Sequence, residues 1–396
     1  MRWVILVSAL AALAAKVYCA ATTIGTTDVI LFHMFGKKIA ASGLLAMYRE
    51  TPMFNHTPLV GGFAAACWHL EEWSGVSLAF FLRLPGIVAD FAAVFALVWL
   101  RARTGHPPGW GIVLFALSPV AFMISGYHGN VDSVLAAILL LATCACVGEK
   151  ARPLACGILL GLACNVKVVA LLLGPLFFFF WWHRQRARPF AAGAIVTTLV
   201  GWAYPLVTIP HIFLKNVLGY GGYWGDWGIT YLLTQAGWNA FAKGGFVDLS
   251  PEQHLVLTGL KVVIVASAIT LAWRSRAADA PGLFTALAGT WAVMFVFGPG
   301  GAPQYLVWLA AFILLESALW YSAVTAGSAV FLFVFYQTIS HGLPWYKGIS
   351  TSALALHWRP WNTLPWLIIA AFLAHATWRG FRARTKLTPS PEPTTH

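Results

Sequence analysis

The chain has 396 residues, of which 59% are hydrophobic and only 10% are charged, and its mean hydropathy is +0.74. Too few polar side chains are present to cover a soluble domain of this size, so the composition predicts an integral membrane protein. The formal net charge of +12 does not indicate nucleic-acid binding, because Lys and Arg stand in short clusters between apolar segments, as they do beside membranes.

The apolar segments predict membrane-spanning helices. They are about 15 to 23 residues long and lack the alternation of a membrane barrel, which leaves helices as the spanning structure. We expect about twelve spans, at residues 3–21, 78–100, 110–125, 131–147, 153–166, 168–182, 189–207, 255–273, 281–298, 305–320, 322–338 and 364–378. The first segment has the basic start of a signal peptide, but its length favours a retained anchor.

The basic clusters set the orientation of these spans. They lie at Arg2, Arg101/Arg103, Lys150/Arg152, Arg184/Arg186/Arg188, Arg274/Arg276 and Arg379/Arg382/Arg384/Lys386. The positive-inside rule places all of them, and both termini, in the cytoplasm. An even number of crossings then separates successive clusters if residues 58–72 form a helix on the outer interface instead of a span. We therefore expect an all-α polytopic bundle over residues 1–386.

Two long loops, residues 22–77 and 208–254, face outward on this topology. The first should carry interfacial helices, and the second is rich in Trp, Tyr and Gly, which predicts an ordered segment against the membrane surface. The last residues, 387–396, are polar and Pro-rich and should form a disordered cytoplasmic tail. The outward face should therefore hold the recognition surface.

Asp28 is an isolated acid just beyond the first predicted span. A carboxylate at the membrane edge can stay ionised and still reach a substrate carried by a lipid, which suits a general base. A loop acid or a helix N-cap would have the same pattern, because Thr26 and Thr27 precede an amphipathic stretch. The residues alone leave these alternatives open.

A second polar group lies between two apolar segments on the same outward face. It contains His128, Asn130 and Asp132 within Ser125-Gly126-Tyr127-His128-Gly129-Asn130-Val131-Asp132-Ser133. Polar groups this close to hydrocarbon are costly unless they are paired. Asp132 could hold a hydroxyl, a metal ion or a cation, or Asn130 and Asp132 could simply cap the next helix.

Two cations near the outward edge are candidates for phosphate binding. Arg83 lies seven residues before Asp90, on nearly the same face of the predicted helix. Lys167 follows Asn165 between two predicted spans. The alternative for Arg83 is a side chain that snorkels to the membrane surface, and the alternative for Lys167 is a structural salt bridge. We expect Asp90 to make a structural pair inside the bundle. Gln304 and Tyr305 open a further span, where an aromatic belt is the alternative to substrate contact.

The sequence does not favour a preformed metal site. The histidines predicted to face outward lack HxxxH or HxH spacing, and the six cysteines lack CxxC spacing and fit buried small apolar residues better. Asp28 also stands alone instead of in an Asp-x-Asp pair. A divalent cation is therefore not expected, and no other cofactor is predicted.

These residues resemble the GT-C superfamily of membrane glycosyltransferases, which use polyprenyl-phosphate sugars. The likeness covers residues 1–180 best and includes an early acid in the first outer loop, Gly43 to Tyr48, and Arg83-Leu84-Pro85. Gly129-Asn130-Val131-Asp132-Ser133 is similar to a motif in the mannosyltransferase of GPI-anchor assembly. The bacterial GT87-like group is the most similar part of the superfamily.

The resemblance implies roles for the candidate residues. Asp28 would be the base that deprotonates the acceptor, with inversion at the anomeric carbon, and Asp132 the second acid. Arg83, His128, Asn130, Lys167, Gln304 and Tyr305 would contact substrate. The partners would be a polyprenyl-phosphate hexose, with mannose favoured, a lipid or glycan acceptor of the cell envelope, and the lipids of the bacterial inner membrane.

Two alternatives remain from the sequence. A twelve-helix secondary transporter would have the same hydropathy, but such proteins usually show a repeat and polar residues near the midplane. Here the polar residues gather at one face and no duplication is visible. A GT-C-like scaffold without activity would keep the fold but tolerate changes at Asp28.

Overall fold

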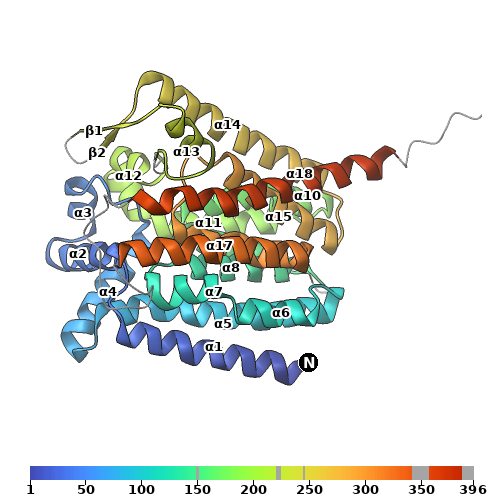
Figure 1. Ribbon diagram of the computed structural model, residues 1–396, viewed down its shortest axis with the longest axis horizontal. Helices are drawn as coiled ribbons and strands as arrows, with labels where there is room; N and C mark the ends of the chain where they lie inside the picture. Colours follow the sequence, from blue (N-terminus) through green and yellow to red (C-terminus); the bar gives the residue numbers. More distant parts are fainter. Residues whose placement is uncertain (149–150, 220–223, 244–245, 341–355, 386–396) are drawn as a thin grey trace, which may run out of the picture.

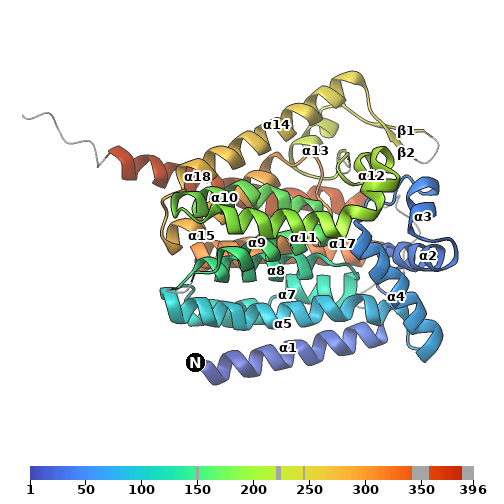
Figure 2. The ribbon, with the colours of Figure 1, turned by 180° about the vertical axis from the view of Figure 1, so that it is seen from behind.

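The computed structural model describes residues 1–148, 151–219, 224–243, 246–340 and 356–385. These residues form a bundle of helices that lie roughly along one axis (Figures 1 and 2). The first half of the bundle consists of α1 (Arg2–Thr22), α5 (Leu78–Thr104), α6 (Gly109–Ala116), α7 (Pro119–Ala121), η1 (Phe122–His128), α8 (Asp132–Cys146), α9 (Pro153–Val166), η2 (Val168–Leu173) and α10 (Gly174–His183). The second half consists of α11 (Ala187–Thr208), α14 (Pro251–Arg274), α15 (Ala280–Phe297), η3 (Pro303–Tyr305), α16 (Leu306–Glu316), α17 (Ala318–Ile339) and α18 (Thr363–Thr385).

The predicted all-α membrane fold is confirmed. Seven described helices are long and apolar enough to cross a membrane, and four shorter apolar helices accompany them. Each predicted span falls on a helix or on a helical segment with a local break. One such break follows Leu117, where Ser118 caps a new helix that begins at Pro119.

The two long loops also contain helices. The first holds α2 (Thr27–Ser42), α3 (Leu44–Glu50) and α4 (Pro58–Ser74), so the expected helix at 58–72 is present. The second holds α12 (Pro210–Val217), α13 (Gly228–Gln235) and two short antiparallel strands, β1 (Phe241–Lys243) and β2 (Phe246–Asp248). In Figure 1 these elements gather at the end of the bundle opposite the N-terminus. We call this end the loop end.

The described part of the second loop packs against the helices of the bundle. Trp227 is buried, and its Nε1–H donates to the Phe295 carbonyl at 2.7 Å. Thr230 Oγ1 lies 2.6 Å from the Pro299 carbonyl, and Asp226 pairs with Arg359 of η4 (Leu356–Asn362) at 2.7 Å. These contacts fix the loop on α15 and on the turn that follows it. The predicted tail, residues 387–396, lies outside the described residues.

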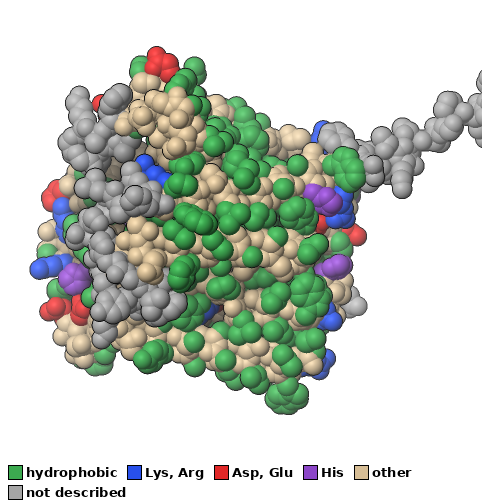
Figure 3. Space-filling view, in the orientation of Figure 1, with side chains coloured by type: hydrophobic (Ala, Val, Ile, Leu, Met, Phe, Trp, Pro, Cys, Tyr) green, Lys and Arg blue, Asp and Glu red, His purple; other side chains and the backbone are tan. Residues whose placement is uncertain are grey.

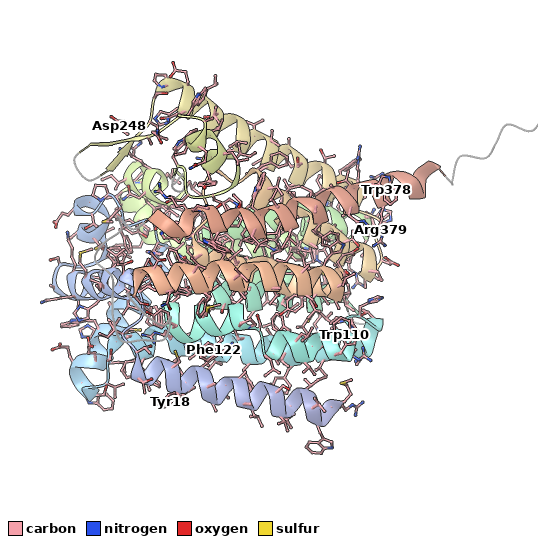
Figure 4. All side chains as sticks on the ribbon, in the orientation of Figure 1. Tyr18, Trp110, Phe122, Asp248, Trp378 and Arg379 are labelled. Atoms are coloured by element: carbon pink, nitrogen blue, oxygen red, sulfur yellow. The ribbon has the colours of Figure 1, made fainter. Side chains whose placement is uncertain are left out.

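The basic segments meet at the opposite end of the bundle. Arg184 Nη2–H donates to the Ala278 carbonyl at 2.7 Å, and Arg186 Nη1–H to the Ala151 carbonyl at 3.4 Å. Figure 3 shows hydrophobic side chains along the middle of the visible face, with charged side chains gathered at both ends. In Figure 4, Tyr18 lies toward the loop end, whereas Trp110 and Trp378 lie toward the other end, as interfacial aromatic residues do.

One buried ion pair joins the peripheral helix α1 to the rest. Lys16 Nζ lies 2.6 Å from Asp90 Oδ2, which also lies 2.6 Å from Ser125 Oγ. An unpaired charge inside an apolar bundle would cost several kcal/mol, so each residue requires the other. The expectation that Asp90 makes a structural pair is confirmed.

We predict that the loop end faces away from the cytoplasm. In a cysteine-free protein, single cysteines at positions 51 and 251 should react with an impermeant thiol reagent added from outside. Cysteines at 105 and 278 should react only after permeabilisation, because their turns carry the basic clusters. Labelling of position 105 in intact cells would overturn this orientation.

Candidate active site

Asp28 lies at the start of α2, but its side chain does not cap that helix. Thr26 is the N-cap, and its Oγ1 accepts the Asp28 backbone N–H at 3.3 Å. The Asp28 carboxylate instead faces three nitrogen atoms, all at Oδ2: Asn130 Nδ2 at 2.7 Å, His128 Nε2 at 3.1 Å and Gln304 Nε2 at 3.3 Å. The structure thus brings together one residue of the first loop and two regions far along the chain.

The two oxygens of Asp28 have different surroundings. Oδ2 holds all three contacts, whereas Oδ1 has no hydrogen-bond partner among the residues that the structure describes. The side chain is 26% exposed. Partial burial acts to raise the pKa of Asp28, but the hydrogen bonds from His128 and Asn130 and the positive charge of Lys167 outweigh it and hold the pKa below its usual value. The result is an ionised carboxylate with Oδ2 held and, among the described residues, Oδ1 without a hydrogen-bond partner.

His128 is placed by an irregular piece of helix. It ends η1, a π-helical segment, and the next residue, Gly129, has φ +83°. A Cβ on Gly129 would lie 2.5 Å from Val29, so glycine lets this turn pack on α2. Thr26 Oγ1 donates to the His128 carbonyl at 2.8 Å, and this bond joins the turn to the N-cap of α2. π-Helical segments of this kind are frequent at functional sites.

Asp132 and Lys167 form a second polar pair. Lys167 Nζ lies 2.7 Å from Asp132 Oδ1, and Trp308 Nε1–H donates to the same oxygen at 2.7 Å. Asp132 is fully buried and its Oδ2 has no partner among the described residues. Its side chain does not cap α8. Asp132 therefore forms an ion pair with Lys167 instead of capping α8. A structural salt bridge was one of the alternatives that the sequence allowed for Lys167.

Lys167 sits at a break between helices. It adopts an extended conformation after α9 ends and before η2 begins, which turns its side chain out of the helical register. The ammonium lies 4.8 Å from the centre of the Tyr305 ring and 5.4 Å from that of Trp308, and these two rings stack at 4.0 Å. The side chain is 15% exposed, so it is accessible at the surface of the cluster.

The two polar groups belong to one site. Gln304, which contacts Asp28, is followed directly by Tyr305, which contacts Lys167. His56 also links them: burial and the charge of Lys167 lower the pKa of its imidazole to about 4, although Asp28 opposes the shift. His56 is thus neutral at physiological pH. The sequence analysis did not single out His56.

Tyr336 is a site residue that the sequence analysis missed. Its hydroxyl lies 2.8 Å from His128 Nδ1, and the residue is fully buried. It stands in an apolar stretch of α17 in which nothing distinguishes it from a core aromatic residue. A buried histidine needs a hydrogen-bond partner at each ring nitrogen, and this was the signal for a further site residue. The sequence alone does not show that the partner is a tyrosine 208 residues away.

The contacts of Arg83 favour a structural role over the phosphate binding that the resemblance implies. The side chain is fully buried, and its guanidinium donates to Thr23 Oγ1 at 2.8 Å and to the carbonyls of Thr23, Ile24 and Gly126 at 2.9, 2.6 and 3.2 Å. These contacts join the end of α1, the start of the first loop and η1. We therefore assign Arg83 to holding the loop end together and not to binding phosphate.

Replacement of Arg83 by alanine should destabilise the protein, because it leaves several buried carbonyls without donors. Unsatisfied buried groups cost about 1–3 kcal/mol each, so the loss should reach several kcal/mol. Thermal unfolding in detergent should show it as a large fall in Tm. Arg49→Ala, on the exposed surface of α3, is the control and should leave Tm unchanged. A stable Arg83→Ala protein with weakened donor binding would restore the original assignment.

The site offers no ready set of metal ligands. In the described ranges, no group of three or more His, Cys, Asp and Glu side chains lies close enough to hold a metal ion. Within the site, Asp28 and His128 already contact each other directly at 3.1 Å.

The hydrogen bonds to Asp28 predict a pH dependence. Because they hold the pKa of Asp28 below its usual value, activity should stay level as the pH falls from 7 toward 5. Asn130→Ala removes the shortest of these bonds, so the pKa of Asp28 should rise and the acid limb of kcat/KM should move to higher pH. An unchanged acid limb in a folded Asn130→Ala protein would show that Asp28 is not the group that titrates.

The fold and this cluster define a polytopic membrane protein with a group of paired ionisable side chains at one end of its helical bundle. The model of glycosyltransferase family 87 matches residues 83–299, and the chain belongs to that family. It is therefore a membrane glycosyltransferase, and the resemblance to the GT87-like group is confirmed. The match includes His128, Asn130, Asp132 and Lys167, while Asp28, Gln304 and Tyr305 lie outside it. No curated protein sequence matches the chain.

Proposed function

We propose that the protein transfers a hexose, mannose in the favoured case, from a polyprenyl-phosphate carrier to a lipid or glycan acceptor, with inversion at the anomeric carbon. The observation that carries this proposal is the asymmetry of Asp28: Oδ2 has three contacts, whereas Oδ1 has no hydrogen-bond partner within the described part of the chain. A base must be fixed in place and yet present a free lone pair to the proton it takes.

The reaction would proceed in one displacement. Asp28 Oδ1 accepts the proton of the acceptor hydroxyl while that oxygen attacks the anomeric carbon from the face opposite the phosphate. The bond between the anomeric carbon and the phosphate oxygen breaks, and the lipid phosphate leaves with the electron pair. A base on one side and a cation on the other is the arrangement that this displacement needs.

Lys167 is the cation that we assign to the leaving phosphate. An ammonium has three N–H donors, and Asp132 Oδ1 takes one of them at 2.7 Å. With 15% of the side chain exposed, the remaining donors can meet a phosphate oxygen at the surface of the cluster. Tyr305 and Trp308 would hold the ammonium in position, and Asp132 would orient it.

A lipid-linked donor fits a site at the end of a membrane bundle. The sequence contains no Gly-rich loop for a nucleotide diphosphate. A polyprenyl carrier needs none, because its apolar chain stays in the bilayer while its phosphate and sugar reach the loop end. We assign the protein to the bacterial inner membrane, with both termini in the cytoplasm and a cell-envelope glycan as the acceptor's class.

A donor panel tests this proposal. The purified protein in nanodiscs is incubated with a polyprenyl-phosphate mannose, the corresponding glucose lipid, or nucleotide sugars, together with lipid and glycan acceptors, and the products are measured by mass spectrometry. We expect product and free polyprenyl phosphate with a lipid donor only. Transfer from nucleotide sugars would overturn the choice of donor. Sugar uptake into proteoliposomes without any product would support the transporter alternative.

A further inference from the structure

Tyr336 and His128 form a chain of polar contacts that ends at the proposed base. Tyr336 lies near the end of α17, and its hydroxyl is 2.8 Å from His128 Nδ1, while His128 Nε2 is 3.1 Å from Asp28 Oδ2. Tyr336 is fully buried and His128 is 3% exposed. The hydrogen bond between Tyr336 and His128 is therefore shielded from competing water.

The donors and acceptors available to Tyr336, His128 and Asp28 decide which atom donates in each contact. A buried phenol must place its proton on an acceptor, and among the described residues the Tyr336 hydroxyl has His128 Nδ1 within reach. If the hydroxyl donates to Nδ1, a neutral imidazole carries its proton on Nε2 and donates it to Asp28. In the opposite tautomer, the Nε2 lone pair would face the carboxylate and the phenol proton would lack that acceptor.

We propose that Tyr336 is a positioning residue that fixes the tautomer of His128 and, through it, holds Oδ2 of Asp28 so that Oδ1 stays open. This inference rests on the proposed role of Asp28 as the base. The ring of Tyr336 packs edge-on against both His128 and Tyr127, at 5.7 and 5.3 Å between centroids, so a phenylalanine can keep the packing and remove only the hydroxyl.

A double-mutant cycle tests whether Tyr336 acts through His128. Tyr336→Phe should lower kcat about ten- to a hundredfold, by analogy with the loss on removing a hydrogen-bond partner that orients a metal-bound histidine, with KM for donor and acceptor changed less than about twofold. His128→Gln keeps an N–H near the Nε2 position but has no Nδ1. In that background, Tyr336→Phe should lower kcat less than about twofold. Tyr321→Phe removes another buried phenol from α17 and should leave kcat unchanged.

An equal loss in both backgrounds would show that Tyr336 acts independently of His128 and would overturn the inference, as would full activity of Tyr336→Phe. Asp28→Asn, assayed alongside, keeps the two claims apart. Activity in Asp28→Asn would defeat the base, whereas an inactive Asp28→Asn with an uncoupled Tyr336 would defeat only the inference drawn here.

A second measurement does not depend on turnover. In protein labelled with ¹⁵N-histidine, the His128 signal can be assigned by its absence in His128→Gln. We expect an unprotonated Nδ1 and a protonated Nε2 in the wild-type protein and a mixture of tautomers in Tyr336→Phe. A protonated Nδ1 in the neutral wild-type ring, or the same tautomer in both proteins, would contradict the proposed direction of the hydrogen bonds.

Discussion

Asp28→Asn is expected to reduce turnover about 10²- to 10⁴-fold, the usual contribution of a positioned general base, with little change in donor binding. An asparagine can place its carbonyl oxygen where Oδ2 lies, so His128, Asn130 and Gln304 keep their acceptor. Its NH₂ group then replaces Oδ1, which removes the proton acceptor alone. Initial rates and donor titrations with the two proteins measure this difference.

The matched control is Asp279→Asn. Asp279 caps α15 at the other end of the bundle, and asparagine can replace it there. This variant should have wild-type turnover and Tm. Wild-type turnover in a folded Asp28→Asn protein would reduce Asp28 to a structural acid, whereas the inactive-scaffold alternative predicts no product from either protein.

Lys167→Ala should have the second largest effect, and this effect should be mainly a loss of unfolding free energy. It leaves Asp132 as a fully buried carboxylate without its cation, and breaking such a pair typically costs about 3–5 kcal/mol. The double variant Lys167→Met with Asp132→Asn removes both charges and should recover most of the lost Tm. Thermal unfolding of the single and double variants in detergent provides the comparison.

The double variant also separates stability from donor binding. If Lys167 contacts the donor phosphate, the folded double variant should bind the donor about ten- to a hundredfold more weakly, since a charge-assisted hydrogen bond contributes roughly 1.5–3 kcal/mol. Lys16→Met with Asp90→Asn removes another buried ion pair, which joins α1 to α5, and should leave donor affinity unchanged. Equal donor affinity in both double variants would limit Lys167 to a structural role.

The fold was predictable because a bilayer permits few solutions. Apolar length and basic clusters together constrain where helices begin and end, and the helices α5, α11 and α17 lie where hydropathy placed them. The break between α9 and η2 at Lys167 was also indicated, because a cation between two short apolar segments cannot continue a buried helix at no cost.

The site was predictable only in part. Asp28, His128 and Asn130 stood out because polar residues beside hydrocarbon require partners, but their mutual contacts depend on how the first loop folds back over the bundle. The structural role that we assign to Arg83 could not be predicted, because its partners are backbone carbonyls, which leave no trace in a sequence. Tyr336 was missed because a single buried hydroxyl looks like a core aromatic residue until its neighbour is known.

The anomeric configuration of the product tests the central claim, a single displacement driven by one base, most directly. A polyprenyl-phosphate hexose of known configuration is given to the wild-type protein, and the product is analysed by NMR through the coupling between H1 and H2, or between C1 and H1 for mannose. We predict a product of inverted configuration. Retention would require a second displacement or a covalent intermediate and would contradict the role assigned to Asp28.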